Sequence, residues 1–334
     1  MIIPVKTASG GYDIILQRGA LKCADQYLNL NRRVLIVTDN GVPAEYARSV
    51  ASLCAAPLVL TIWQGEQSKS IDSWTLILKK LSENGFTRSD CVVAVGGGVV
   101  GDLAGFAASV YMRGIDFYNI PTTVLSQVDS SIGGKTAVDF MGYKNIVGAF
   151  YPPKAVIIDP DTLSTLPDRQ ISNGLCEALK MSLTHDAELF KIFESGNAKK
   201  EIDTVIERSL YIKRSVVEAD EREGGLRMVL NFGHTLAHAI ESANGMEELY
   251  HGECVAIGML PMCSKEIRER LVPVLKNLGL PTEVQGSREK LFEAMRHDKK
   301  LSGKDITIVF VPEVGSFRFE KLPLDTLIER MKDI

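Results

Sequence analysis

The chain has 334 residues, 45% of them hydrophobic, and a formal net charge of −4. This length accommodates two domains with large cores, and the slight acidity disfavours a nucleic acid as the main partner. No apolar stretch is long enough to span a membrane, and the first residues lack the pattern of an export signal. Six cysteines without CxxC spacing are typical of reduced thiols packed in a core. Together these features predict a cytoplasmic protein that acts on small molecules.

The first half of the chain alternates short β-branched runs with helical patterns, which is typical of a mostly parallel sheet covered by helices. We expect a Rossmann-like α/β domain over residues 1–165. Its predicted elements are a hairpin at 1–16, strands at 33–38, 91–95, 119–121 and 155–158, and a helix at 70–84.

After about residue 168 the pattern changes to long helical periodicities. We therefore expect a second, mainly α-helical domain over residues 166–334. Its predicted elements are helices at 173–193, 199–219, 228–243 and 254–270, a small hairpin within 305–319 and a last helix at 324–331.

A glycine-rich turn follows a predicted buried strand directly and has the sequence Gly96–Gly97–Gly98–Val99–Val100–Gly101–Asp102. It satisfies the GxGxxG pattern, in which glycines let the backbone approach a pyrophosphate at a helix N-terminus. The pattern predicts dinucleotide binding and a helix over 103–110. Asp39, which ends an early strand, is a better candidate for the ribose-binding acid than Asp116, which opens an apolar run. The alternative is a turn that only allows tight packing of a strand against a helix.

Groups suited to an anionic ligand are concentrated between residues 111 and 145. The stretch includes Lys135, Lys144 and Asn145, and two lysines beside an asparagine can bind a phosphate and a carboxylate. A P-loop for a nucleoside triphosphate is not supported, because Asp129 occupies the position of its first glycine. The alternative is a solvated basic loop.

Two of the five histidines, His234 and His238, stand four residues apart and so share one helix face. His251 follows a short loop and opens another apolar run. This arrangement is typical of a metal site, and zinc with three protein ligands keeps one position open for water or substrate. A zinc protease is excluded, because Thr235 stands where its catalytic glutamate would be.

Glu177 and Lys180 stand three residues apart on a predicted helix. Such a pair is commonly a surface ion pair. Here the flanking residues are apolar, which indicates a helix enclosed on several sides and favours a role in a site. Lys213, Arg227 and Asn231 add polar groups just before the histidine helix.

Taken in order, these motifs resemble those of the 3-dehydroquinate synthase family, from about residue 33 to residue 300. The resemblance implies a Rossmann-like, mostly parallel α/β domain followed by a mainly helical metal-binding domain. It also implies conversion of 3-deoxy-D-arabino-heptulosonate 7-phosphate into 3-dehydroquinate and phosphate, with bound NAD and a divalent metal, usually zinc, with cobalt as an alternative. The matching segments are 96–106, 111–114, 121–123, 127–136, 142–145 and 230–241.

The resemblance further implies the residues of the site. The metal would be held by Glu177, His234 and His251. Substrate contacts would come from Asp129, Lys135, Lys144, Asn145, Lys180, Lys213, Arg227, Asn231 and His238, with Lys299 or Lys300 on the phosphate side. Cofactor contacts would come from Asp39, Glu66, Lys69, Gly97, Gly98, Val99, Gly101, Asp102, Thr122 and Thr123.

Arg113 is expected to reach a substrate phosphate bound by a neighbouring subunit. A helix over 102–112 would be about 16 Å long, which separates Arg113 from the pyrophosphate end of its own chain. This interpretation predicts at least a homodimer with shared active sites.

Three other functions stay open at this point. One is another sugar-phosphate cyclase, of the aminocyclitol or valiolone type, with the same NAD and metal. A second is a metal-dependent alcohol or polyol dehydrogenase, which the phosphate-directed group Lys135, Lys144 and Asn145 disfavours. A third is a non-catalytic NAD-binding regulator, which would need neither the metal ligands nor the anion ligands.

Overall fold

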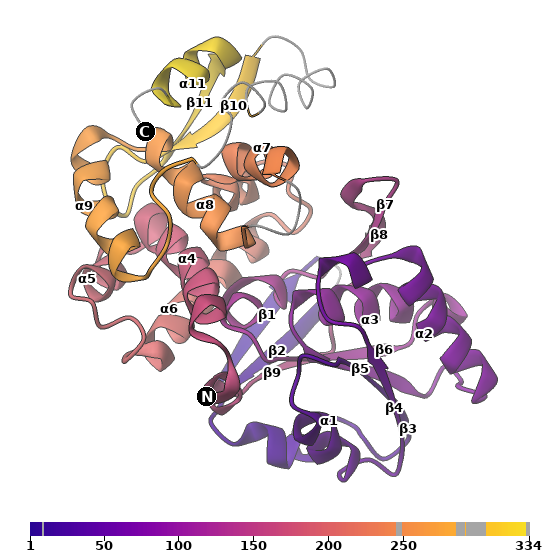
Figure 1. Cartoon of the computed structure of the whole chain (residues 1–334). Helices are drawn as coiled ribbons and strands as arrows, with labels where there is room; N and C mark the ends of the chain where they lie inside the picture. Colours follow the sequence, from indigo (N-terminus) through magenta and orange to yellow (C-terminus); the bar gives the residue numbers. More distant parts are fainter. Residues whose placement is uncertain (9, 245–248, 285–290, 292–304, 332–334) are drawn as a thin grey trace. The chain divides into compact units, whose positions relative to one another are not determined.

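The computed structural model describes residues 1–8, 10–244, 249–284, 291 and 305–331. The chain divides into two compact units, Met1–Pro167 and Asp168–Ile334 (Figure 1). Among the described residues, no helix combines the length and the apolar character that a membrane crossing requires.

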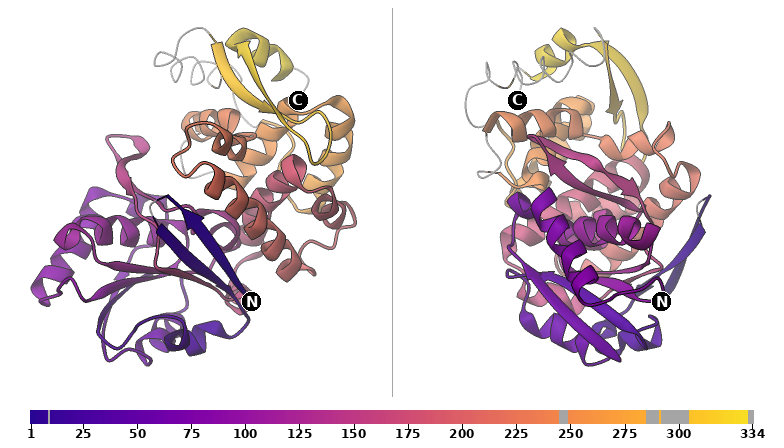
Figure 2. Two further views of the ribbon diagram at one scale, coloured as in Figure 1. Left: turned by 180° about the vertical axis from the view of Figure 1, so that it is seen from behind. Right: turned by 90° about the vertical axis from the view of Figure 1, so that its right-hand side faces the viewer.

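The first unit is built on a seven-stranded sheet with the order β1-β2-β9-β6-β5-β3-β4. Only β1 and β2 pair antiparallel, and they form one side of the sheet (Figure 2). The remaining pairs are parallel, which confirms the predicted mostly parallel sheet. The strands are β1 (Ile2–Thr7), β2 (Gly10–Leu16), β3 (Arg33–Asp39), β4 (Ala56–Ile62), β5 (Cys91–Gly96), β6 (Asp116–Pro121) and β9 (Ala155–Ile158).

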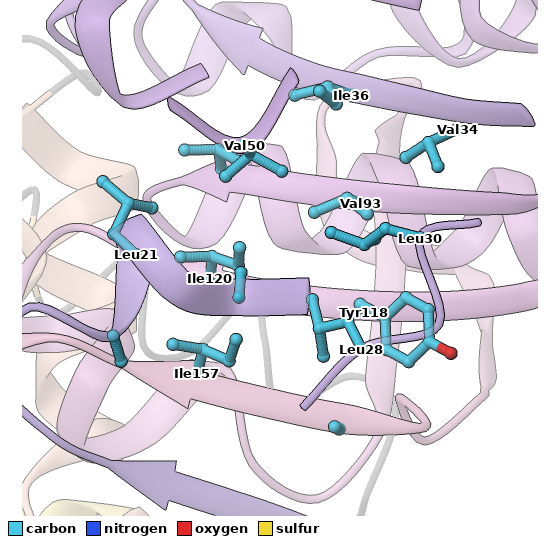
Figure 3. Packing of buried hydrophobic residues seen from close by; sticks show 14 of the residues in the cluster. Leu21, Leu28, Leu30, Val34, Ile36, Val50, Val93, Tyr118, Ile120 and Ile157 are labelled. Atoms are coloured by element: carbon cyan, nitrogen blue, oxygen red, sulfur yellow. The ribbon is translucent and has the colours of Figure 1, made fainter. Parts of the chain in front are cut away.

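Successive side chains of a strand point to opposite sides of the sheet, and in this sheet the side chains on both faces are buried. On β3, Val34 and Ile36 pack on one face with Val50 of helix α1 (Ala44–Ala51) (Figure 3). Leu35 and Val37 pack on the other face with helices α2 (Ile71–Glu83) and α3 (Gly98–Val110). Strand β4 and helix α1 are absent from the prediction, although β4, an edge strand, is apolar along most of its length.

The parallel strands place three candidate segments at one edge of the sheet. Strand β3 ends at Asp39, β5 ends at Gly96, and β6 ends at Pro121, which pairs with Gly96. Carboxyl ends of parallel strands are the usual ligand-binding edge of such sheets. The glycine-rich turn and the segment that starts at Thr122 therefore begin at neighbouring positions.

A separate antiparallel hairpin, β7 (Lys135–Phe140) and β8 (Tyr143–Phe150), carries the end of the polar stretch. It extends from the first unit in Figure 1. The segment is therefore a hairpin and not a loop, although Lys135 and Lys144 are exposed. Strand β7 lies across α3, where a Cβ on Gly105 would come within 2.5 Å of Thr136 Cγ2.

The second unit is mainly helical, as predicted, but three predicted helices are each interrupted. Asp186 ends the first one and caps α5 by accepting from the backbone N–H groups of Glu188 and Leu189. The histidine helix begins only at His234, after a short 3-10 turn, and Ser264 caps a new helix within the predicted 254–270. The helices are α4 (Asp168–His185), α5 (Ala187–Glu194), α6 (Ile202–Ala219), α7 (His234–Asn244), α8 (His251–Met259), α9 (Lys265–Asn277) and α11 (Leu324–Met331).

The predicted C-terminal hairpin and the last helix are confirmed. Strands β10 (Asp305–Phe310) and β11 (Arg318–Pro323) pair antiparallel, and α11 follows directly.

Candidate active site

The second unit contains a compact cluster of three side chains of metal-ligand type. Glu177 lies on α4, and His234 and His251 are the first residues of α7 and α8. One ligand atom from each residue lies within 4.8 Å of the others. Glu177 Oε1 is 3.8 Å from His234 Nε2 and 3.6 Å from His251 Nε2.

Two close helix approaches bring these residues together. Gly252 of α8 packs on α4, because a Cβ there would lie 2.1 Å from the carbonyl oxygen of Asn173. The Gly252 N–H also donates to Asn173 Oδ1 at 2.6 Å. Gly258 approaches the start of α7 as closely, since its Cβ would lie 2.1 Å from the carbonyl oxygen of Gly233. Only glycine permits such distances, so the sequence positions α8 against both helices that carry the other ligands.

A second layer of groups orients both imidazoles. His251 Nδ1 lies 2.8 Å from Glu241 Oε1, and His234 Nδ1 lies 3.2 Å from the carbonyl oxygen of Phe232. A hydrogen bond at Nδ1 leaves Nε2 free to bind a metal, which is the usual arrangement around metal-binding histidines. Glu241 is not among the site residues predicted from the sequence. Its position seven residues after His234, two turns along the same helix face, is a signal that could have found it.

The electrostatics of the cluster suit a divalent cation. Burial raises the pKa of the Glu177 carboxyl, but Lys180, His251 and His234 outweigh it and bring the pKa well below its usual range. Burial and Lys180 lower the pKa of His234 well below its usual value. Burial also opposes the charging of His251, but Glu177 and Glu241 raise its pKa to about 9. An anionic Glu177 and a neutral His234 are the forms that bind a metal, and a cation would replace the proton of His251.

The surroundings of Glu177 show whether the cluster suits a bound metal ion. Its side chain is 1% exposed, and its Oε1 has no hydrogen-bond partner within the described part of the chain. Lys180 forms an ion pair with Oε2, while its Nζ donates to the carbonyl oxygen of Leu230 at 2.5 Å. The alternative of a surface ion pair is therefore wrong, because both partners are buried. Oε1 faces the two histidines, and a carboxylate with two histidines is a known donor set for catalytic zinc.

The other candidates of the second unit differ in exposure. His238 is exposed, and its ring centroid is 5.6 Å from that of His234, outside the group of three ligand atoms. Lys213, on α6, is buried. Lys299 and Lys300 lie outside the described residues.

The loop before α7 contains two more candidate residues, Arg227 and Asn231, and both form hydrogen bonds with acidic residues of the same loop. Asp220 accepts from the backbone N–H of Arg227 at 2.9 Å, and the buried guanidinium of Arg227 donates to the carbonyl oxygen of Glu221. Asn231 is exposed, and its Nδ2 donates to Glu223 Oε1 at 3.0 Å. These contacts fix the loop before any ligand is bound.

In the first unit, the glycine-rich turn is followed by a helix that starts earlier than expected. Helix α3 begins at Gly98, so the predicted start at residue 103 is wrong. Because glycine has low helix propensity, the predicted helix starts only after the glycines. One of these glycines also allows the helix to pack closely on the sheet, because a Cβ on Gly101 would lie 3.0 Å from Asn119 Nδ2 on β6. Backbone N–H groups of the first helical turn therefore lie directly after β5.

Lys69 connects candidate cofactor and substrate residues. It is 6% exposed, its Nζ lies 2.5 Å from Asp102 Oδ2, and it donates to Asn145 Oδ1. Burial lowers the pKa of Lys69, but Asp102 and Glu66 outweigh it and raise the pKa. Asp39 is held in its own turn, where its Oδ1 accepts from the N–H groups of residues 41 and 42.

A small polar pocket adjoins this network. Its lining includes Asp102, Asn119, Ser130, Lys135 and Thr136. Asn119 Oδ1 and Ser130 Oγ are buried without a partner among the described residues. Neither residue is among the site residues predicted from the sequence, although an asparagine inside an otherwise apolar strand end is a visible signal. Asp129, next to Ser130, is half-buried, and Lys144 is exposed on the hairpin.

Arg113 stands at the far end of α3. The helix runs over Gly98–Val110, so the expected range of 102–112 is wrong at both ends. Met112 and Arg113 follow in a turn with left-handed φ angles of 51° and 66°. Arg113 is exposed, and thirteen helical residues separate it from the glycine-rich turn by about 20 Å.

The parallel-sheet unit with its glycine-rich turn, and the helical unit with its buried Glu-His-His cluster, define a two-domain enzyme class. Two solved structures show the same architecture. One is 2-deoxy-scyllo-inosose synthase complexed with carbaglucose-6-phosphate, NAD+ and Co2+, with a TM-score of 0.90, 25% identity and 100% coverage of both chains. The other is 2-epi-5-epi-valiolone synthase from Streptomyces hygroscopicus subsp. jinggangensis with NAD+ and Zn2+ bound, with a TM-score of 0.87, 29% identity and coverage of 96% and 95%.

Within this class the chain belongs to the 3-dehydroquinate synthase family. The family model for the N-terminal domain matches residues 59–173, and the model for the C-terminal domain matches residues 174–301. The 3-dehydroquinate synthase of Streptococcus thermophilus is 40% identical to this chain, with 99% of the chain and 100% of the relative covered. The resemblance drawn from the motifs is thereby confirmed.

Proposed function

We propose that the chain converts 3-deoxy-D-arabino-heptulosonate 7-phosphate into 3-dehydroquinate and phosphate. The observation that carries this choice is the 40% identity to a 3-dehydroquinate synthase over 99% of the chain. Identity to the two cyclases with other products is lower, at 25% and 29%. Glu177 Oε1, which has no hydrogen-bond partner among the described residues, and the ion pair between buried Lys69 and half-buried Asp102 support a site that uses a metal and a dinucleotide.

Glu177, His234 and His251 would hold the divalent cation, with zinc or cobalt as the candidates. A bound cation would act as a Lewis acid on the hydroxyls of the substrate, and bound NAD would take up a hydride and return it within one turnover. Glu241 and the carbonyl of Phe232 would keep both Nε2 atoms directed at the cation.

The first unit would bind NAD at the edge where β3, β5 and β6 end. The free N–H groups at the start of α3 suit a pyrophosphate, because a helix N-terminus attracts negative charge. Lys69 and Asp102 would present a fixed pair of charges to the ribose hydroxyls. The proposed contacts are Asp39, Glu66, Lys69, Gly97, Gly98, Val99, Gly101, Asp102, Thr122 and Thr123.

Positive charge is available for both anionic groups of the substrate. Lys135 and Lys144 would bind the phosphate as exposed cations, with Asn145 as a directional donor. Buried cations of the second unit would bind the end of the substrate that carries its carboxylate and hydroxyl groups. The proposed contacts are Asp129, Lys135, Lys144, Asn145, Lys180, Lys213, Arg227, Asn231 and His238, with Lys299 or Lys300.

Arg113 would serve a partner subunit in a homodimer. Its place at the end of α3 opposite the glycine-rich turn supports this role, because the turn and Lys69 lie at the other end of the same helix. A two-fold partner would receive the guanidinium at its own phosphate-binding group.

The test is incubation with the heptulosonate phosphate while phosphate release and product formation are followed together. Equal amounts of phosphate and 3-dehydroquinate are expected. A parallel incubation with glucose 6-phosphate addresses the rival cyclase, since a carbocyclic analogue of this sugar phosphate is bound in the inosose synthase structure. Turnover of glucose 6-phosphate alone would contradict the proposed substrate.

A further inference from the structure

The hairpin that carries Lys144 and Asn145 has an irregular register. Val138 pairs with Val147, and Phe140 pairs with Tyr143. Between these pairs, Asp139 alone on β7 faces residues 144–146 on β8. Strand β8 therefore bulges outward at the two residues proposed to contact the substrate.

Three hydrogen bonds close a ring through this bulge. The Asn145 N–H donates to Asp139 Oδ1 at 2.8 Å, and the Asp139 N–H donates to the carbonyl oxygen of Lys69 at 2.8 Å. Lys69 Nζ then donates to Asn145 Oδ1, which completes the ring. Each of the three residues thus contacts the other two.

The ring is attached to a rigid part of the unit at Lys69. This lysine is buried and forms an ion pair with Asp102 of α3, just after the first turn of the helix. Asn145, in contrast, is exposed and has a left-handed φ of 57°. Asparagine tolerates this conformation better than most residues, but it persists only where neighbouring groups hold it.

We propose that Asp139 is a positioning residue, which shapes the β8 bulge so that Asn145 is held on Lys69 and ready for substrate. The proposal rests on the proposed function of Lys69, Asp102 and Asn145. Asp139 itself touches neither substrate nor cofactor in this account. It acts through the backbone N–H of Asn145, whereas the Lys69–Asp102 ion pair is a separate contact.

Two substitutions separate this role from a general effect of charge. D139A removes the acceptor for the Asn145 N–H, whereas D139N keeps an acceptor oxygen of the same reach. D139A should raise the KM for the heptulosonate phosphate about tenfold, as expected for one lost hydrogen bond, and change kcat less than about threefold. D139N should stay within about threefold of the wild type in both constants. NAD affinity by calorimetry should change less than about threefold in both variants. Asp13→Ala, on an exposed position of β2, is the matched control.

Amide hydrogen exchange supplies a readout that needs neither substrate nor turnover. In the wild type, the Asn145 amide should exchange at least about tenfold more slowly than in an unstructured peptide, and D139A should remove this protection. An unprotected Asn145 amide in the wild type would overturn the proposal even if D139A failed to fold. So would a D139N variant as impaired as D139A. If the wild type binds NAD but does not turn over the heptulosonate phosphate, the proposed function fails, while the exchange experiment still decides the role of Asp139.

Discussion

The metal cluster and the β7–β8 hairpin hold their candidate side chains in opposite ways. Glu177 is buried on α4, and His234 and His251 each begin a helix that glycine contacts fix against its neighbour. Lys144 and Asn145 stand exposed on a bulged hairpin. The fold itself thus holds the three proposed cation ligands in place. The proposed substrate contact Asn145 depends instead on a few hydrogen bonds, so the two regions should respond differently to single substitutions.

The largest effect is expected at the preorganised cluster. His234→Ala removes one of three ligands, so it should abolish bound metal and reduce activity at least about 1,000-fold. His238→Ala should keep the metal, because its ring lies outside the ligand group. Metal content by mass spectrometry checks both variants. Stoichiometric metal in His234→Ala would show that the cluster is not the metal site.

The next largest effect is expected at the exposed residues that are proposed to bind the substrate phosphate. Arg113→Ala and Lys135→Ala should each be nearly inactive, because both lose a proposed contact with the substrate phosphate. Mixing the two chains should restore about a quarter of wild-type activity, since half of the dimers are mixed and each has one intact site. Confirmed subunit exchange without recovered activity would place Arg113 within its own chain's site.

A smaller effect, on zinc affinity, is expected when the carboxylate that contacts His251 Nδ1 is removed. Glu241→Ala removes the acceptor 2.8 Å from His251 Nδ1, so zinc affinity should fall about 10- to 100-fold while the protein stays folded. Glu188→Ala, an exposed acid on α5, should leave zinc affinity unchanged. Competition with a chelator measures the affinity. Equal affinity in Glu241→Ala and wild type would mean that helix packing alone orients His251.

The smallest expected effect is on the free energy of unfolding, at the contact between α8 and α4. Gly252→Ala would place a Cβ 2.1 Å from the Asn173 carbonyl oxygen, which should lower the free energy of unfolding by about 1–3 kcal/mol. Gly224→Ala meets no atom closer than 3.9 Å and should change it by less than about 0.5 kcal/mol. Urea unfolding of both variants is the measurement. An equal effect of the two substitutions would contradict the role assigned to the α8–α4 contact.

The two regions also differ in how well the sequence predicts them. The histidines at positions 234, 238 and 251 predict a metal site, but the i, i+4 spacing does not identify the ligands, because the cluster of ligand-type side chains contains His234 and His251 and not His238. The buried parallel strands appear as continuous apolar runs. The β8 bulge could not be predicted, because it depends on a hydrogen bond from Asn145 to Asp139 and on the distant Lys69. The start of α3 at Gly98 was missed for a related reason, since tertiary packing on β6 overrides the low helix propensity of glycine.

In the proposed reaction, one substrate molecule is oxidised and reduced again during a single visit to the enzyme. The most direct measurement adds NAD in an amount equal to the enzyme and the heptulosonate phosphate in large excess, and follows absorbance of NADH together with phosphate. The account predicts many equivalents of phosphate per NAD and no accumulation of NADH. Accumulation of NADH in step with substrate consumption would contradict it, because the chain would then be a dehydrogenase.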